Sequence, residues 1–251
     1  MTKRSHSSPR DLLGPTLAVV GFALLGACGG TEGPKDNGLV TERWGDAEEK
    51  RPADDGLAVT GLMGTLDADE IRAGLDPRMG KFQRCFIRGY DDVDVLGGQI
   101  DMTFHVNLDG TVAWVFPIRS NVGHRGVEKC IVDVAKGARF PEPRGGEAEF
   151  SWPLAMDPPE DVRPAVPWNE DALGDARTEY DAAVRACGRL RADVQVTLYI
   201  APGGQVLQAG ASTPDRDTES RLDCIVEAAR SMVFADPGSY PAKAVLVLKG
   251  R

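Results

Sequence analysis

Two pairs of cysteines in matching sequence settings constrain the fold of this chain more than any other feature. The string CIVDVAKGARF, which begins at Cys130, resembles CIVEAARSMVF, which begins at Cys224. The same offset aligns a glycine and a phenylalanine that punctuate each half: Gly110 with Gly204 and Phe140 with Phe234. Chance similarity between two unrelated hairpins is the alternative. Three residue types that match at one offset instead favour a small domain that is present twice.

Hydrophobic periodicity indicates the same order of elements in both halves. Alternating apolar and polar residues over 100–106 and 194–200 are typical of half-buried strands, and the glycine turns that follow bend each strand into a hairpin. An amphipathic helical pattern precedes each hairpin and another follows it, and strands over 148–154 and 242–248 complete the halves. Because a sheet buries its apolar face against helices, we predict an α+β fold. It consists of two tandem α-β-β-α-β domains, each an antiparallel three-stranded sheet with two helices on one face and one disulfide.

The first helix of the first copy has a recognisable start and an interruption. Asp67, with Glu70 three residues later, is the signature of a capping box. Pro77 interrupts the apolar pattern, so Asp76 and Pro77 are expected to restart the helix as N-cap and N1. The sequence therefore predicts a kinked or two-piece helix.

The amino-terminal segment has the pattern of an export signal. Basic residues precede an uncharged apolar run over 12–27 that is too short to span a bilayer comfortably. The string LGAC, which ends at Cys28, resembles the lipobox of bacterial lipoproteins and implies cleavage before Cys28 and lipid attachment to its thiol. An ordinary signal peptide or a transmembrane anchor with an incidental cysteine is the alternative. Since no aspartate follows Cys28, the sorting rule for such proteins implies the outer membrane, with the periplasmic face preferred.

Composition divides the chain into five segments. We assign 1–27 to a lipoprotein signal peptide, 28–56 to a disordered tether, 57–156 to the first domain, 157–167 to a proline-rich linker and 168–251 to a degenerate second copy. The first domain has room for an additional short strand over 57–63.

The four cysteines of the two copies are expected to form disulfides. Four cysteines allow three pairings, and the repeat selects Cys85–Cys130 and Cys187–Cys224. A zinc site is the alternative, but the sequence holds no C-x-x-C, and an exported chain lives in an oxidising compartment. Closing loops of this size is worth about 4 kcal/mol each. The bridges are predicted to be structural rather than redox-active.

Charge and motif content argue against several functions. The formal net charge of -9 disfavours binding to nucleic acid. The sequence lacks the motifs of serine hydrolases, zinc proteases and phosphate-binding loops. His124 is expected to be solvated or to cap a helix, and the acidic stretch around Asp92 lacks the spacing of a calcium loop. We therefore predict no catalytic residue, no metal site and no cofactor.

Four strings of the first copy together resemble the C-terminal domain of AgmX/PglI-type proteins: GLMGTLDADEI, FQRCF, GGQIDMTFHVNLDGTV and KCIVDVAKGARFPEP. These domains are similar to the C-terminal domains of TonB and TolA. The resemblance covers 57–156. Residues 168–251 are a degenerate version that lacks the Gly-Thr-Leu string and has a shorter loop after Cys187. The resemblance implies this fold and an interaction role, without catalytic residues, in envelope machinery for motility, secretion or transduction.

A partner is expected on the sheet face opposite the helices. The family pattern G-x-V-x-x-V places Val115 in the core, so that Trp114 and Phe116 join His105 on the open face. Simple alternation would instead bury Trp114 and Phe116. We predict a non-enzymatic protein, held at the membrane by its lipid anchor, that binds an envelope protein or peptide. The alternative is a structural lipoprotein that self-associates or braces an envelope complex.

Overall fold

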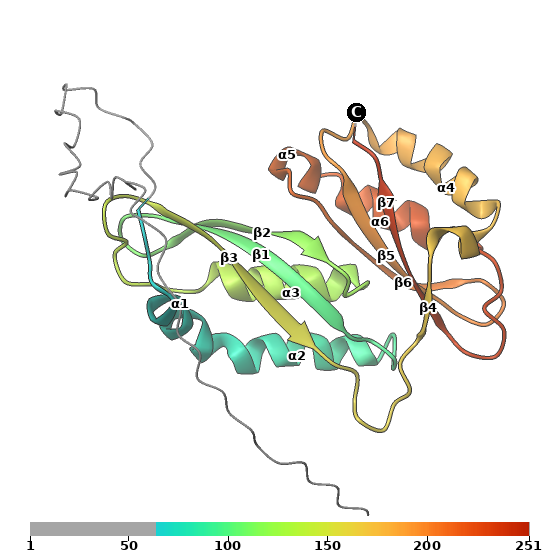
Figure 1. Ribbon diagram of the computed structural model, residues 1–251, viewed down its shortest axis with the longest axis horizontal. Coiled ribbons are helices and arrows are strands. Elements are labelled where there is room, and N and C mark those ends of the chain that lie inside the picture. The colour runs from blue at the N-terminus through green and yellow to red at the C-terminus, as the bar shows by residue number, and fades with distance from the viewer. Residues whose placement is uncertain (1–63, 251) are drawn as a thin grey trace, which may run out of the picture. The chain divides into compact units, whose positions relative to one another are not determined.

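The computed structural model of the protein describes residues 64–250 (Figure 1). These residues belong to one compact unit, Leu57–Arg251. The predicted signal peptide, the lipid-attachment residue Cys28, the tether and the additional strand over 57–63 lie outside the described residues. The predicted α+β class is confirmed for the part that is described.

The first copy follows the predicted order of elements. Its helices are α1, the 3-10 turn η1, α2 and α3, which span Ala68–Leu75, Asp76–Arg78, Met79–Tyr90 and Arg125–Lys136. Its strands β1, β2 and β3 span Gly98–Val106, Val112–Ser120 and Ala148–Met156. Both neighbours of β1 run antiparallel to it, in the order β2-β1-β3, and α2 and α3 lie together on one face of the sheet (Figure 1).

The start and the interruption of the first helix are confirmed. The Asp67 carboxylate accepts hydrogen bonds from the backbone N–H groups of Asp69 and Glu70, at 3.1 and 2.9 Å, and the Glu70 side chain accepts one from Asp67 N at 2.8 Å. Pro77 lies in the 3-10 turn between α1 and α2, so the helix is in two pieces. The expected restart with Asp76 as N-cap and Pro77 as N1 is wrong: Asp76 is the C-cap of α1, and the N-cap of α2 is Arg78. The capping box therefore satisfies backbone N–H donors at the N-terminus of α1.

The second copy has the same elements and one more strand. Its helical segments are η2, α4, η3, α5 and α6, which span Glu170–Leu173, Ala176–Val184, Arg185–Cys187, Arg216–Glu219 and Leu222–Arg230. Its strands β5, β6 and β7 span Val194–Ile200, Val206–Ser212 and Ala242–Leu248. The short strand β4 (Val166–Trp168) pairs in parallel with β7, so the sheet order is β4-β7-β5-β6. Three residues with a central proline carry no period-two pattern, which is why β4 was not predicted.

In each copy, the glycine and the phenylalanine that the two halves share make the same backbone contact. Gly110 has a φ of +76°, and a Cβ at this position would lie 1.9 Å from the Phe140 carbonyl oxygen. Gly204 has a φ of +84°, and its Cβ would lie 2.1 Å from the Phe234 carbonyl oxygen. Each glycine carbonyl in turn accepts a hydrogen bond from that phenylalanine's N–H, at 2.9 and 2.8 Å. Only glycine tolerates both the positive φ and the close approach.

Candidate functional site

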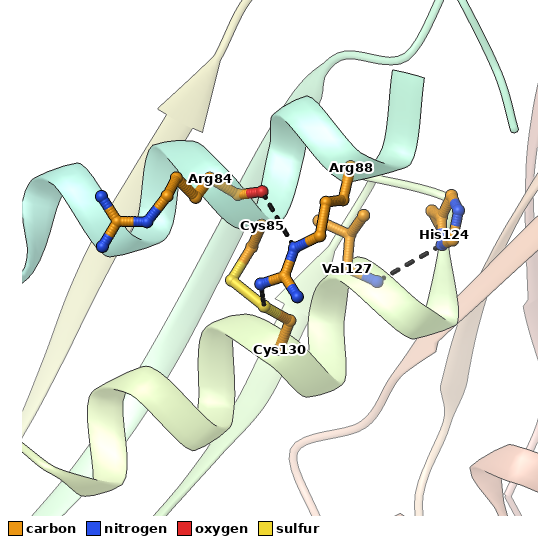
Figure 2. Close-up of a disulfide and its surroundings, with 6 residues drawn as sticks. All are labelled: Arg84, Cys85, Arg88, His124, Val127 and Cys130. Atoms are coloured by element: carbon orange, nitrogen blue, oxygen red, sulfur yellow. Dashed lines mark hydrogen bonds between the residues drawn. A yellow bond between two sulfur atoms is a disulfide. The ribbon is translucent and has the colours of Figure 1, made fainter. Parts of the chain in front are cut away.

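Both predicted disulfides are present. Cys85–Cys130 joins α2 to α3, with 5.8 Å between the two Cα atoms (Figure 2). Cys187–Cys224 joins η3 to α6, with 5.7 Å between the Cα atoms. The loops that they close span 45 and 37 positions, for which the chain-entropy model gives about 4 kcal/mol of stabilisation each. In both copies the bridge therefore ties together the two helical segments that cover the sheet.

Polar side chains cover the first disulfide. The Arg88 guanidinium lies over it, with Nη2 3.2 Å from Cys130 Sγ, while its Nε donates to the Arg84 carbonyl at 3.3 Å (Figure 2). Nearby, His124 caps α3 as predicted: its Nδ1 accepts from Val127 N at 3.3 Å. Its Nε2 lies 2.9 Å from an Asp92 carboxylate oxygen. These contacts hold the disulfide and the helix terminus in place.

The three residues predicted to form a partner-binding face lie together, but the face is not open. His105 and Trp114 are cross-strand partners with their rings stacked 5.0 Å apart, and Trp114 lies 5.6 Å from Phe116. Val115 belongs to the core cluster, as predicted. Phe116, however, is only 6% exposed. The expectation that Phe116 is available to a partner on an open face is therefore wrong.

The second copy accounts for this closure. The Arg216 guanidinium lies over the Trp114 ring at 5.2 Å, and Thr213 N donates to the Pro117 carbonyl at 3.4 Å. On the other side of the same face, His105 Nε2 contacts a Glu147 oxygen at 2.8 Å, while its Nδ1 is buried and has no hydrogen-bond partner in the described structure. The family pattern placed these residues on one sheet face, but it could not show that the other copy covers part of that face.

Tyr199 of the second copy extends into the core of the first. The alternation over 194–200 placed it on the polar face of its strand, yet it is fully buried and packs with the first copy's core cluster. Its hydroxyl donates to the Gly97 carbonyl at 2.9 Å and accepts from Gly97 N at 3.1 Å. Burial raises the pKa of Tyr199 to about 12. The uncharged Tyr199 side chain therefore packs into the first copy and joins the two copies.

A lysine and a glutamate complete this interface. Lys243 Nζ donates to the Gly97 carbonyl at 2.6 Å and lies 5.3 Å from the Tyr199 ring centre, and burial lowers its pKa to about 8. Glu128 on α3 is fully buried and accepts hydrogen bonds from the Ser120 hydroxyl at 2.7 Å and from Ala211 N at 3.1 Å. Burial raises the pKa of Glu128, although Arg125 opposes the shift. Sequence analysis identified neither residue, because a charged residue within an amphipathic element normally lies on its solvated face.

The sheet edges differ in how they are covered. The outer edges of β2 and β6 face one another, and Ser120 N donates to the Ser212 hydroxyl at 2.7 Å. The edge of β7 is covered first by β4 and then by side chains, since Val247 N donates to Glu170 Oε1 at 2.7 Å. On β3, the isolated bridge between Gly64 and Ala148 is followed by no further pairing with any described residue. The outer edge of β3 is therefore the longest one that stays free in residues 64–250.

Alternation identifies the free groups of β3. The Glu147 carbonyl accepts a hydrogen bond from Gly64 N at 2.6 Å, so it points to the outer side. Because backbone groups alternate in direction along a strand, Glu149, Ser151, Pro153 and Ala155 direct their backbone groups outward. All four residues are exposed. Pro153 lies where its missing N–H removes no bond to β1, which is where edge strands tolerate proline.

Comparison with known proteins shows little similarity. No family model matches the sequence, and no curated protein matches it. Among solved structures, the chain is similar to the TonB C-terminal domain of Helicobacter pylori (residues 179–285), determined by NMR in solution. The identity is 18%, the TM-score is 0.25, and the match covers 39% of this chain and all of the other. This similarity concerns the fold alone.

Two kinds of feature are absent from the part of the chain that is described. None of the helices within 64–250 is both long and apolar enough to cross a membrane. No group of three or more His, Cys, Asp or Glu side chains in the same residues is arranged to hold a metal ion.

Proposed function

We propose that this chain is a non-enzymatic, lipid-anchored protein of the cell envelope that binds an extended segment of a partner protein along β3. The free outer edge of β3 (Ala148–Met156) supports this proposal most directly. An exposed strand edge presents unpaired N–H and C=O groups, and a partner segment satisfies them when it adds a strand to the sheet.

Two further features support the location and the class of protein. The lipobox-like string that ends at Cys28 supports attachment to the outer membrane through a lipid, facing the periplasm. The two disulfides suit an oxidising compartment outside the cytoplasm. The sequence holds no motif of serine hydrolases, zinc proteases or phosphate-binding loops, and we propose no catalytic residue and no cofactor.

The proposal is tested by removing one outward N–H of β3. Ser151→Pro deletes the outward donor and leaves the bonds between β3 and β1 intact, whereas Ser151→Ala keeps the donor and serves as the matched control. A photo-crosslinking amino acid at Glu149, in cells that produce the full chain, should capture a partner in the wild-type and Ser151→Ala backgrounds. The crosslink should be lost in Ser151→Pro. Equal capture in all three backgrounds would show that β3 does not bind by strand addition.

A structural lipoprotein remains the second candidate because the two copies pack on one another. Tyr199 and Glu128 are fully buried in that contact, which indicates a rigid tandem body rather than two separately moving modules. If the Glu149 crosslink joins two copies of this chain, self-association along β3 replaces partner capture as the function. Sedimentation of the detergent-solubilised full chain would then give a dimer or a larger species.

A further inference from the structure

All charged side chains of helix α2 in the first copy are cations, although the protein is acidic overall. The chain carries 38 Asp and Glu residues against 29 Lys and Arg residues. In contrast, α2 holds three cations and no carboxylate: Lys81, Arg84 and Arg88. The turn before it adds a fourth cation, Arg78, and one carboxylate, Asp76. None of the four forms an ion pair with any described carboxylate, while most other cations of the first copy do. Unpaired cations gathered on one element create a local positive potential.

Three of these cations border a groove between α2 and α3. The groove has a volume of about 530 Å³ and is lined by Arg78, Lys81 and Arg88 from one side and by Lys129 from the other. Its single lining carboxylate, Asp133, is engaged by Lys136 at 3.3 Å. The groove is therefore shallow and positively charged.

The molecule already contains the kind of contact that would fill such a groove. Asp223 on α6 accepts a hydrogen bond from Arg125 Nε at 2.7 Å and another from Lys129 Nζ at 3.0 Å. Glu219, four residues earlier, lies 3.8 Å from Arg125. Two carboxylates at this spacing thus engage the cations of α3 from the side of the second copy. The cations of α2 have no corresponding carboxylates.

Two apolar side chains lie on the same helix as these cations. Ile87 is 52% exposed and Met79 is 38% exposed, although both are large and hydrophobic. Neither residue lines the groove, but apolar contacts beside charged pairs are typical of protein interfaces.

We propose that the groove between α2 and α3 binds an acidic segment of a partner protein, with carboxylates spaced as Glu219 and Asp223 are. This surface is separate from the edge of β3, so it adds a second recognition site. Three charge pairs at a solvated surface, with Arg78, Lys81 and Arg88 and each worth about 0.2–1 kcal/mol, would make the affinity strongly dependent on salt.

The test uses the full chain in non-ionic detergent and a fluorescein-labelled peptide of Glu-Ala-Glu-Leu repeats. Fluorescence anisotropy should show binding that weakens with added salt, and the matching Gln-Ala-Gln-Leu peptide should not bind. Lys81→Glu combined with Arg84→Glu should weaken binding roughly tenfold or more, since one cation that lines the groove and a second cation on the same helix become repulsive. The side chains of both residues are exposed and make no hydrogen bond or ion pair in the described structure, so the fold should be retained.

A charge-matched control separates the groove from the overall charge. Arg185→Glu combined with Arg230→Glu changes the net charge by the same amount at exposed positions of the second copy and should leave binding unchanged. Equal loss in the two double variants, or no binding of the acidic peptide to the wild type, would overturn the proposal. It would also be overturned if nanodiscs that contain phosphatidylglycerol protect α2 from hydrogen exchange while the peptide does not. The Ser151→Pro variant should bind this peptide normally, so failure here is distinguishable from failure of the β3 proposal.

Discussion

Tyr199 offers the sharpest test of the contact between the copies. Tyr199→Phe keeps the ring in the core of the first copy and removes only the hydroxyl. The Gly97 carbonyl would keep its bond from Lys243, but Gly97 N–H, at a buried position, would lose its acceptor. An unsatisfied buried donor costs about 1–3 kcal/mol. We expect the free energy of unfolding to fall by that amount.

Urea denaturation of the full chain, followed by circular dichroism, measures this loss through the transition midpoint at an unchanged slope. Tyr240→Phe is the matched control, because the Tyr240 hydroxyl donates to the Arg163 carbonyl at a partly exposed site where water can replace it. Its effect should stay within about 0.5 kcal/mol. If the two substitutions cost the same, or if the two copies unfold in separate transitions that Tyr199→Phe leaves unmoved, the hydroxyl does not join the copies.

Three other substitutions test the interface and the anchor. Burial lowers the pKa of Lys243 to about 8, so above that pH the unfolded chain binds more protons than the folded chain. The free energy of unfolding should therefore rise from pH 8 to pH 10 by up to about 3 kcal/mol. Lys243→Met should abolish this rise in urea titrations. Burial raises the pKa of Glu128, so the stability that this group contributes is complete at low pH and is lost as pH rises through the folded-state pKa. Glu128→Gln should match the thermal stability of the wild type near pH 4 and exceed it at pH 8. A variant that is less stable than the wild type at pH 8 would contradict this direction of the pKa shift. Cys28→Ser should leave an uncleaved precursor without palmitate label, whereas normal processing and membrane retention would exclude a lipoprotein.

Local features of the fold were predictable because each depends on residues that are close in sequence. The capping box of Asp67 and Glu70 lies within one helical turn, and the break at Pro77 follows from a missing backbone donor. The alternation in β1 and β5 identified two faces for each strand. The cysteine pairing followed from the repeat, since two equivalent copies must bridge equivalent helices.

The candidate site was predicted less well because it depends on which surfaces meet. The family pattern assigned Phe116, and period-two alternation assigned Tyr199, to the face away from the helices. Neither could show that both residues are buried where the copies join. Glu128 is charged and lies on an amphipathic helix, so sequence alone places it in solvent, yet the backbone of β6 supplies a hydrogen-bond donor and excludes water. The short strand β4 forms only because β7 offers it an unpaired edge.

The sequence by itself therefore determined the order of the elements, their caps and turns, and the pairing of the cysteines. Only the tertiary structure decided which of the four long sheet edges stays free and which predicted surface residues become interior. The physical reason is that a residue pattern indicates which residues share a face of a helix or strand, whereas the burial of that face depends on contacts between segments that are distant in sequence. In this protein those contacts join Gly97 to Tyr199 and Lys243, and Glu128 to Ala211.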